Sequence, residues 1–196
     1  MIILPLFLFS FHYSTQWSKI KKLDEQQLPK SALKLTKHIY NKNLEEKNET
    51  QFIKAVIFKQ KYLFIQSEDT QAQSIYELEK ELNKALKLST KLLLKSLLAE
   101  FYMNYLDAYH YKIRQRTTIK NHPSKDINTW SIKQLVEKST ALYLSTLNPK
   151  TQTILMTEYQ EILTKGKYVE DLYPTLYDFL AFRALNHFKN TRYYLH

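Results

Sequence analysis

The chain has 196 residues, 44 % of them hydrophobic and 14 % aromatic, with one glycine, no cysteine and a formal net charge of +10. This apolar content excludes an intrinsically disordered chain, and the scarcity of glycine disfavours β-hairpins, so helices are predicted nearly throughout. Without cysteine there can be no disulfide, thiolate metal site, cysteine nucleophile or cysteine-linked lipid anchor.

The N-terminal stretch MIILPLFLFSFHYSTQW begins with an apolar run. A helix needs roughly 20 apolar residues to cross a bilayer, so this run is too short for a transmembrane helix. It resembles the hydrophobic part of a secretory signal, although neither Lys nor Arg precedes it and no small-x-small cleavage site follows it. We interpret residues 1–15 as a signal peptide or its remnant and residues 16–196 as one helical domain. The alternative is a buried N-terminal segment.

Two amphipathic helices are predicted next. The first follows Trp17 and runs to about Gln27, and the second opens at Pro29, because the first turn of a helix tolerates a missing N–H. The second helix has apolar side chains at three- and four-residue steps, so it is predicted to be half buried. These side chains are Ala32, Leu35, Ile39 and Tyr40.

A more apolar helix is predicted after residue 48. Asn48 and Gln51 have the spacing of a capping box, and the run FIKAVIFKQKYLFI that follows is apolar on most sides, which indicates a central position. Asp69 is the predicted cap of the next helix, which carries a narrower apolar stripe. The stripe consists of Ile75, Leu78, Leu82 and Leu86.

A break at Ser89 and Thr90 precedes a long helix with one broad apolar face. An aromatic ladder of this kind is typical of a protein core and not of a cofactor site. We interpret it as the structural spine of the domain. The face consists of Leu94, Leu97, Leu98, Phe101, Tyr102, Tyr105 and Tyr109.

Residues 114–128, RQRTTIKNHPSKDIN, lose the helical period, turn basic and contain Pro123, which makes this the longest predicted loop. Its cations are flanked by Tyr109 and Tyr111, which suits phosphate contacts and base stacking, or equally an acidic protein surface. A solvated loop is the structural alternative, and no nucleic-acid-binding motif accompanies the charge. The candidate partner-binding residues are Lys112, Arg114, Arg116, Lys120 and Lys125.

The next helix has a well-defined predicted start. Ser131 and Gln134 have the spacing of a capping box, and the helix is predicted to end before Pro149. Trp130 is placed to pack on Leu135 as a hydrophobic staple. Trp130 is therefore predicted to be structural.

Another helix is predicted from about Thr151 to Thr164, and Gly166 suits the left-handed position that closes a helix. The chain thus has about seven predicted helices in antiparallel pairs of roughly 35 to 45 residues. This pattern indicates an all-α fold in which the pairs stack as a tetratricopeptide-like α-solenoid.

The stretch YPTLYDFLAFRALNHF gathers polar groups near the C-terminus. Pro174 suits an extended entry, and Thr175 and Asp178 have capping-box spacing, so these three residues are predicted to start a helix. Asp178 lies about 140° around the helix from Arg183, so no catalytic triad with His187 can form within it. The apolar side chains are predicted to be buried. They are Leu176, Phe179, Leu180, Phe182, Leu185 and Phe188.

The sequence carries no motif of an enzyme or of a cofactor site. The six histidines form no HxxxH or HExxH pair, no glycine-rich loop could cradle phosphates, and no serine has a G-x-S-x-G setting. We therefore predict no catalytic residue, no metal and no cofactor. An enzyme would require His110, Arg114 and Asp126 to meet from different elements.

Seven stretches occur in an order that resembles a known family. The chain resembles, over residues 16–190, the helical N-terminal region of the large bacterial alpha-2-macroglobulin family proteins of the Bacteroidetes type. The most specific pieces are LPKSAL, DINTWSI and PTLYDFLAFRAL. The seven stretches are WSKIKKLDEQQLPKSALKLTKHIY, QFIKAVIFKQKYL, ELEKEL, LLLKSLLAEFYMNYL, KIRQRT, DINTWSIKQLVEKSTALYLSTL and YPTLYDFLAFRALNHF.

The resemblance implies a non-catalytic scaffold or interaction domain of a secreted, periplasmic or envelope protease inhibitor. Members of the family trap proteases with a bait region, β-sandwich domains and often a Cys-x-x-Gln thioester, none of which this sequence carries. The implied partners are the remaining domains of such a protein, or proteases. The alternative is a stand-alone basic α-helical module that binds nucleic acid or protein, with nucleic acid the less favoured partner.

Overall fold

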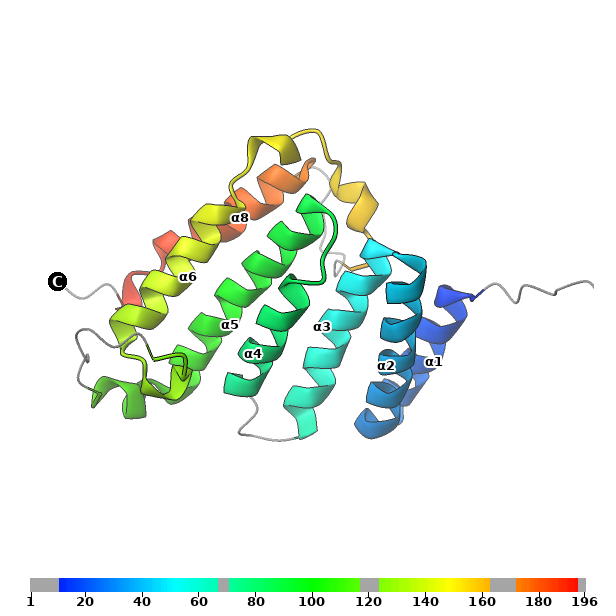
Figure 1. Cartoon of the computed structure of the whole chain (residues 1–196), viewed down its shortest axis with the longest axis horizontal. Helices are drawn as coiled ribbons and strands as arrows, with labels where there is room; N and C mark the ends of the chain where they lie inside the picture. Colours follow the sequence, from blue (N-terminus) through cyan, green and yellow to red (C-terminus); the bar gives the residue numbers. More distant parts are fainter. Residues whose placement is uncertain (1–10, 67–70, 117–123, 163–171, 194–196) are drawn as a thin grey trace, which may run out of the picture.

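The structure is a computed structural model that describes residues 11–66, 71–116, 124–162 and 172–193. In these residues it contains seven α-helices, short 3-10 turns and one isolated β-bridge (Figure 1). The α-helices are α1 (Tyr13–Glu25), α2 (Pro29–Glu46), α3 (Glu49–Gln66), α4 (Gln71–Leu82), α5 (Leu88–Arg114), α6 (Ile132–Thr146) and α8 (Leu176–Lys189). The 3-10 turns are η1 (Ile127–Thr129), η2 (Pro149–Thr151), η3 (Met156–Tyr159) and η4 (Thr191–Tyr193).

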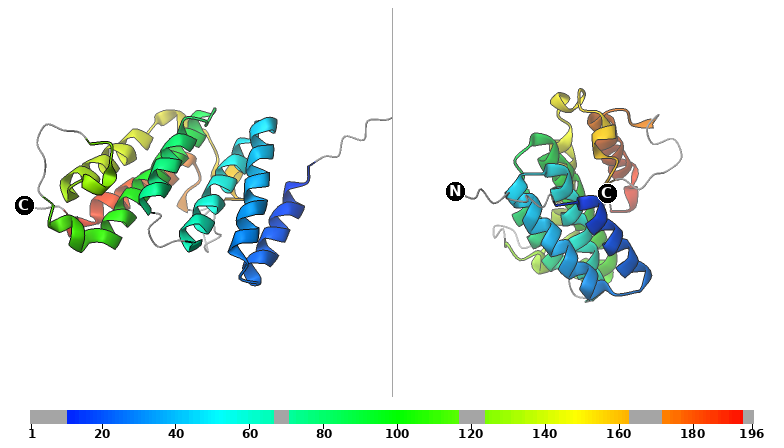
Figure 2. Two further views of the ribbon diagram at one scale, coloured as in Figure 1. Left: turned by 60° about the horizontal axis from the view of Figure 1, so that its bottom comes forward. Right: turned by 90° about the vertical axis from the view of Figure 1, so that its right-hand side faces the viewer.

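Each helix packs antiparallel on its neighbours in the chain. Figure 1 shows the helices side by side from α1 at one end to α6 at the other, with α8 against α6 and α5. The views in Figure 2 show the same succession, with α1 and α2 far from α6 and α8. The predicted all-α class and the number of helices are thereby confirmed.

Apolar packing explains the beginning of the row. α1 starts at Tyr13, inside the stretch that we interpret as a signal, and buries Trp17 against Phe58 of α3 at a ring distance of 4.9 Å. The indole Nε1 of Trp17 donates to Oε1 of Gln51 at 2.6 Å. Pro29 occupies the first turn of α2, as the sequence predicts. Trp17 therefore attaches α1 to α3, and Pro29 marks the start of α2.

Asn48 begins α3, but only half of the predicted capping box is present. The backbone N–H of Gln51 donates to Oδ1 of Asn48 at 3.2 Å. The Gln51 side chain does not return to Asn48, because it accepts from Trp17 and donates to Oε2 of Glu161 at 2.6 Å. α3 packs on α2, α4 and α5, which is the central position that its apolar run predicts.

Two helices end in a left-handed residue that is not glycine. Gln27 has φ 56° and Lys47 has φ 55°, and they follow α1 and α2. The amide of Leu28 then donates to the Leu23 carbonyl at 2.9 Å, and that of Asn48 to the Asn43 carbonyl at 3.0 Å. These six-to-one bonds are those of the Schellman motif, in which glycine is preferred because a Cβ makes the left-handed conformation unfavourable.

We therefore expect Gln27→Gly and Lys47→Gly each to raise the free energy of unfolding by about 0.5 to 1 kcal/mol, measured by urea denaturation. The matched control is Lys37→Gly on the exposed side of α2, which should lower it by about 1 kcal/mol. A loss of stability in all three variants would contradict the left-handed geometry.

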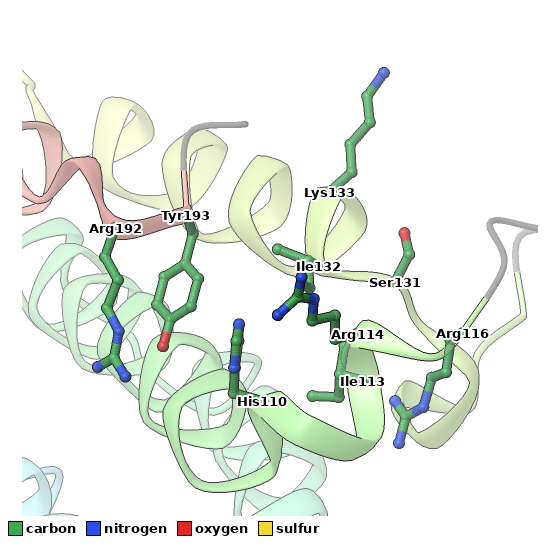
Figure 3. Close-up of a pocket in the computed structure, with 9 residues that line it drawn as sticks. All are labelled: His110, Ile113, Arg114, Arg116, Ser131, Ile132, Lys133, Arg192 and Tyr193. Atoms are coloured by element: carbon green, nitrogen blue, oxygen red, sulfur yellow. The ribbon is translucent and has the colours of Figure 1, made fainter. Parts of the chain in front are cut away.

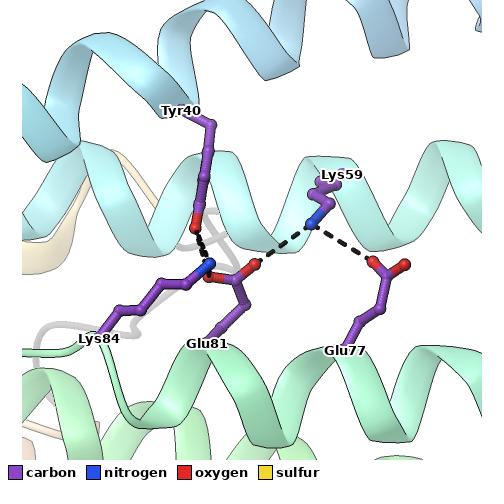
Figure 4. Close-up of polar contacts among 5 residues, drawn as sticks. All are labelled: Tyr40, Lys59, Glu77, Glu81 and Lys84. Carbon is purple, nitrogen blue, oxygen red and sulfur yellow. Dashed lines mark hydrogen bonds and ion pairs between the residues drawn. The ribbon is translucent and has the colours of Figure 1, made fainter.

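A buried carboxylate joins α2, α3 and α4 (Figure 4). Glu81 accepts from the Tyr40 hydroxyl at 2.5 Å and from Lys59 Nζ at 3.2 Å, and Lys84 Nζ lies 3.2 Å from it. Lys59 also lies 3.3 Å from Glu77. Burial opposes the charge on Lys59, but the attraction of Glu81 and Glu77 outweighs it and raises the pKa of Lys59. The negative charge of Glu81 is therefore compensated by two lysines and by the Tyr40 hydroxyl.

Removal of this carboxylate should be costly, because it leaves buried partners uncompensated. We expect Glu81→Ala to lower the free energy of unfolding by about 3 kcal/mol in urea denaturation. Glu137→Ala is the control: Glu137 pairs with Lys133 on the exposed side of α6, and its loss should cost at most about 0.5 kcal/mol. Equal losses in the two variants would show that the Glu81 network does not hold the helices.

α5 is buried on several sides and not only on its predicted face. Leu94, Leu98, Tyr102 and Tyr105 are buried as predicted, whereas Leu97, Phe101 and Tyr109 are only partly covered. The opposite side is buried as well, under α4, α6 and α8. α5 begins at Leu88, so the predicted break at Ser89 and Thr90 is wrong and both residues lie buried in its first turn.

The apolar stripe of α4 ends earlier than predicted. Ile75 and Leu78 are fully buried and Leu82 is half-buried, but Leu86 is exposed because α4 ends at Leu82. The predicted cap Asp69 lies outside the described residues.

The predicted helix from Thr151 to Thr164 is wrong for residues 151–162. The segment forms η2 and η3 instead, because backbone bonds to a distant segment compete with the helix: the Met156 N–H donates to the Pro174 carbonyl at 3.1 Å and the Leu176 N–H to the Ile154 carbonyl at 2.8 Å. Figure 1 shows this segment crossing from α6 to the start of α3. The predicted closing residue Gly166 lies outside the described residues.

Candidate functional site

A hollow of about 410 Å³ lies where the end of α5 meets the start of α6 and η4 (Figure 3). Basic side chains surround an apolar floor. The floor consists of Ile113, Ile132 and Tyr193. The basic side chains are His110, Arg114, Arg116, Lys133 and Arg192. We call this site the basic hollow.

The last turn of α5 presents Arg114. Ile113 is 1 % exposed and anchors that turn in the core, so Arg114 on the next position faces outwards. Figure 3 shows its side chain reaching over Ile113 towards Ile132. Among the described residues, no hydrogen bond or ion pair holds the Arg114 guanidinium. Its charge is therefore available to a ligand.

Arg116 and Trp130 fix the two sides of the junction between α5 and α6. Nη1 of Arg116 donates to the Trp130 carbonyl at 3.1 Å. The Trp130 ring stacks on Tyr102 at 5.6 Å with an interplanar angle of 6°, and its Nε1 donates to the Ser124 carbonyl at 2.8 Å. The predicted structural partner of Trp130, Leu135, is buried, but the ring contact that the structure provides is with Tyr102.

The start of α6 forms one wall of the basic hollow. Ser131 Oγ accepts from the Gln134 N–H at 3.4 Å, and Gln134 Oε1 accepts from the Ser131 N–H at 2.9 Å, so the predicted capping box is formed. The positive end of the helix dipole points at the same region as Arg114. This wall adds positive potential to the side-chain charges.

η4 closes the opposite wall. Arg192 Nη1 donates to Oδ1 of Asp107 at 3.2 Å, and the Tyr193 hydroxyl donates to the same carboxylate. The Tyr193 ring is 6 % exposed and packs on His110 at 5.3 Å. Burial and the bond to Asp107 raise the pKa of Tyr193 to about 12, so it remains a hydroxyl donor at neutral pH. Asp107 is consequently engaged by η4.

The predicted partner-binding residues do not all come together. Arg114 and Arg116 line the basic hollow, whereas Lys112 lies over the Tyr109 ring at 5.8 Å and Lys125 lines a different depression beside Tyr76. Lys120 lies outside the described residues.

The hypothetical catalytic set is also separated. His110 and Arg114 line the basic hollow, but Asp126 accepts from Tyr76 at 3.2 Å and from the Asn128 N–H at 2.9 Å beside another depression. The hydrogen bonds from Asn128 lower the pKa of Asp126. Asp126 is thus a turn cap of η1.

Five residues of the basic hollow have no role in the sequence-based prediction: Ile113, Ile132, Lys133, Arg192 and Tyr193. Arg192 and Tyr193 follow α8 in the chain and reach α5 only through tertiary packing. The helix-start pattern at Ser131 predicts that Lys133 lies in the first turn of a helix. It does not predict which residues of other elements lie near Lys133. No local spacing connects Arg192 or Tyr193 to Arg114.

The polar groups of α8 are capped or paired. Thr175 and Asp178 form the predicted capping box. Arg183 donates to Ser96 Oγ at 2.6 Å and to Glu100 at 2.7 Å, both on α5. These contacts attach α8 to α5. Pro174 contributes its carbonyl to the bond with the Met156 N–H.

His187 is a buried side chain in the contact between α8 and α6. Its Nε2 lies 2.9 Å from Oγ1 of Thr140, and its ring packs on Tyr143 and Phe188. Burial lowers the pKa of His187 below its ordinary value of 6.5. The neutral imidazole is therefore the form that the folded chain prefers.

Three apolar side chains of α8 that were predicted to be buried are exposed, which is a correction. Phe182 is 41 %, Leu185 48 % and Phe188 37 % exposed. α8 packs on α6 and α5 through a different stripe, so these side chains lie off the contact. The packed stripe consists of Leu176, Leu180, Ala184 and His187.

A lowered histidine pKa predicts a loss of stability in acid. The unfolded chain binds the proton first, so the contribution of His187 is complete above pH 6.5 and declines as the pH falls below this value. We expect the stability advantage of the wild type over His187→Gln, measured by urea denaturation, to shrink below pH 6.5. A constant difference between the two proteins would contradict the neutral, buried imidazole.

Within the described ranges, no group of three His, Asp or Glu side chains could hold a metal ion, and no helix is long and apolar enough to span a membrane. Comparisons with known protein families, curated proteins and solved structures find no match. The resemblance to the alpha-2-macroglobulin family therefore remains a prediction from the sequence stretches.

Proposed function

We propose that the chain is a non-catalytic helical scaffold that binds a protein partner through the basic hollow. The observation that carries this proposal is Arg114, which has no partner among the described residues and lies beside an apolar floor that includes the buried Ile113. The basic hollow combines this exposed guanidinium, a helix N-terminus and apolar side chains. Arginine beside apolar groups is typical of sites at which one protein anchors another.

The order of the helices supports a scaffold role. Each helix packs mainly on its chain neighbours, and we infer that the row is a tetratricopeptide-like α-solenoid. In such folds each helix pair buries the apolar side of the next, and the stack offers a long surface for partners. The basic hollow then lies at one end of this stack.

The family resemblance supplies a specific partner. We propose that the domain belongs to a secreted, periplasmic or envelope alpha-2-macroglobulin-like protease inhibitor and that it docks on the other domains of such a protein or on a protease. The signal-like residues 1–15 support this location. The part of the protein responsible for trapping would be the partner and not this domain.

Nucleic-acid binding is the second candidate. The net charge of +10 and the exposed Tyr111 favour it, because cations and stacking rings are what single strands require. Seven lysines of the described residues, however, are paired with acids, as Lys42 is with Glu45 at 3.0 Å and Lys59 with Glu81. Such pairing reduces the positive charge available to phosphates.

Site-specific photo-crosslinking in the source cells tests the proposal. A crosslinking residue at Lys133, on the rim of the basic hollow, should capture a protein with β-sandwich domains, identified by mass spectrometry. The matched control is Lys19, an exposed position on α1 at the other end of the row, which should not capture it. Nucleic acid as the sole product at Lys133, or the same products at both positions, would contradict the proposal.

A further inference from the structure

We infer that the basic hollow binds an acidic peptide segment whose carboxylates flank one apolar side chain. This inference rests on the proposed function, because it names the chemistry of the partner at the same site. The apolar side chain would rest on Ile113, Ile132 and Tyr193, and a flanking carboxylate would meet Arg114.

The positive charge of the basic hollow favours a negatively charged ligand. The nearby acids are already engaged: Asp107 by Arg192 and Tyr193, and Glu137 by Lys133 at 3.8 Å. Arg114 has no partner among the described residues, and the guanidinium fork accommodates a carboxylate through two parallel hydrogen bonds. The amide end of α6 adds a positive partial charge on the same side.

The apolar floor of the basic hollow favours a ligand that carries an apolar group beside its carboxylate. Ile113 and Tyr193 are nearly covered by the fold and Ile132 is partly covered, so the bottom of the hollow is apolar and Ile132 supplies most of the surface that a ligand could cover. A volume of about 410 Å³ accommodates one large side chain together with adjacent backbone. A ligand that carried only charges would leave this apolar surface uncovered.

The arrangement of the cations favours a peptide over a nucleic acid. A strand of nucleic acid presents evenly spaced phosphates and is matched by a row of cations along one groove. Figure 3 shows a different arrangement, in which Lys133 and Arg116 point away from Arg114 in different directions. One central anchor with cations on its rim fits a short segment with acid on both sides of an apolar residue.

Fluorescence anisotropy with defined probes tests this inference. The probes are labelled peptides of sequence Asp-Glu-Phe-Glu-Asp and Asp-Glu-Ala-Glu-Asp, and a labelled oligothymidylate of similar charge. The full chain should bind the phenylalanine peptide about tenfold more tightly than the alanine peptide and than the oligothymidylate. Affinity for the phenylalanine peptide should fall with salt, since ion pairs contribute to it.

Variants of Arg114 test whether the phenylalanine peptide binds at the basic hollow. Arg114→Ala should weaken binding of the phenylalanine peptide about tenfold, and Arg114→Lys should restore only part of the loss, because lysine lacks the bidentate fork. Arg114 is exposed and has no partner in the part of the chain that the structure describes, so its variants should keep the thermal unfolding midpoint of the wild type. Lys19→Ala on α1 is the matched control and should bind as the wild type does.

Equal binding of the two peptides, tighter binding of the oligothymidylate, or no effect of Arg114→Ala would overturn the inference. These outcomes are distinguishable from failure of the proposed function. If Lys133 still crosslinks the β-sandwich protein in cells while the peptide results fail, only the chemistry assigned to the basic hollow is wrong. If the crosslink is lost, the protein-binding role itself is wrong.

Discussion

The packing of α5 against four other helices is the constraint on which the rest of the structure depends. α5 packs on α3, α4, α6 and α8, its buried side chains run from Ser89 to Leu106, and Ile113 is buried again in the last turn. Because Ile113 is anchored in the core, the backbone of the next residue, Arg114, has a defined position. The charge of Arg114 is therefore presented from the end of a packed helix, and a loop would present the same charge with less precision.

Hydrogen bonds and ion pairs between helices determine how the helices pack on one another. Glu81 joins three helices, Arg183 attaches α8 to α5, and the Ser139 hydroxyl donates to the Ala99 carbonyl at 2.9 Å between α6 and α5. A buried polar group is stable only with its partner, so each tie favours one arrangement of the helices. This explains why the arginine and histidine of α8 serve packing between helices, whereas its aspartate caps the start of the helix.

Patterns among neighbouring residues predict much of the fold. They fail where segments far apart in the sequence compete for the same backbone hydrogen bonds. Pro29 and the boxes at Ser131 and Thr175 depend on neighbouring residues, so spacing predicts them. Residues 151–162 bond to the distant Pro174 and Leu176 backbone, which no helical period reveals. The candidate site was half predictable for the same reason: Arg114 and Arg116 stood out by charge, whereas the wall formed by η4 is a product of tertiary packing.

Amide hydrogen exchange along α5 tests the central claim most directly. If the packing of α5 secures the helix as far as its last turn, the amides of Leu106 and Ile113 should exchange as slowly as that of Leu98, through global unfolding alone. The last turn would then hold Arg114 as rigidly as the middle of the helix. Exchange at Ile113 that is much faster than at Leu98, with a smaller dependence on denaturant, would show that the last turn opens independently and would contradict the account.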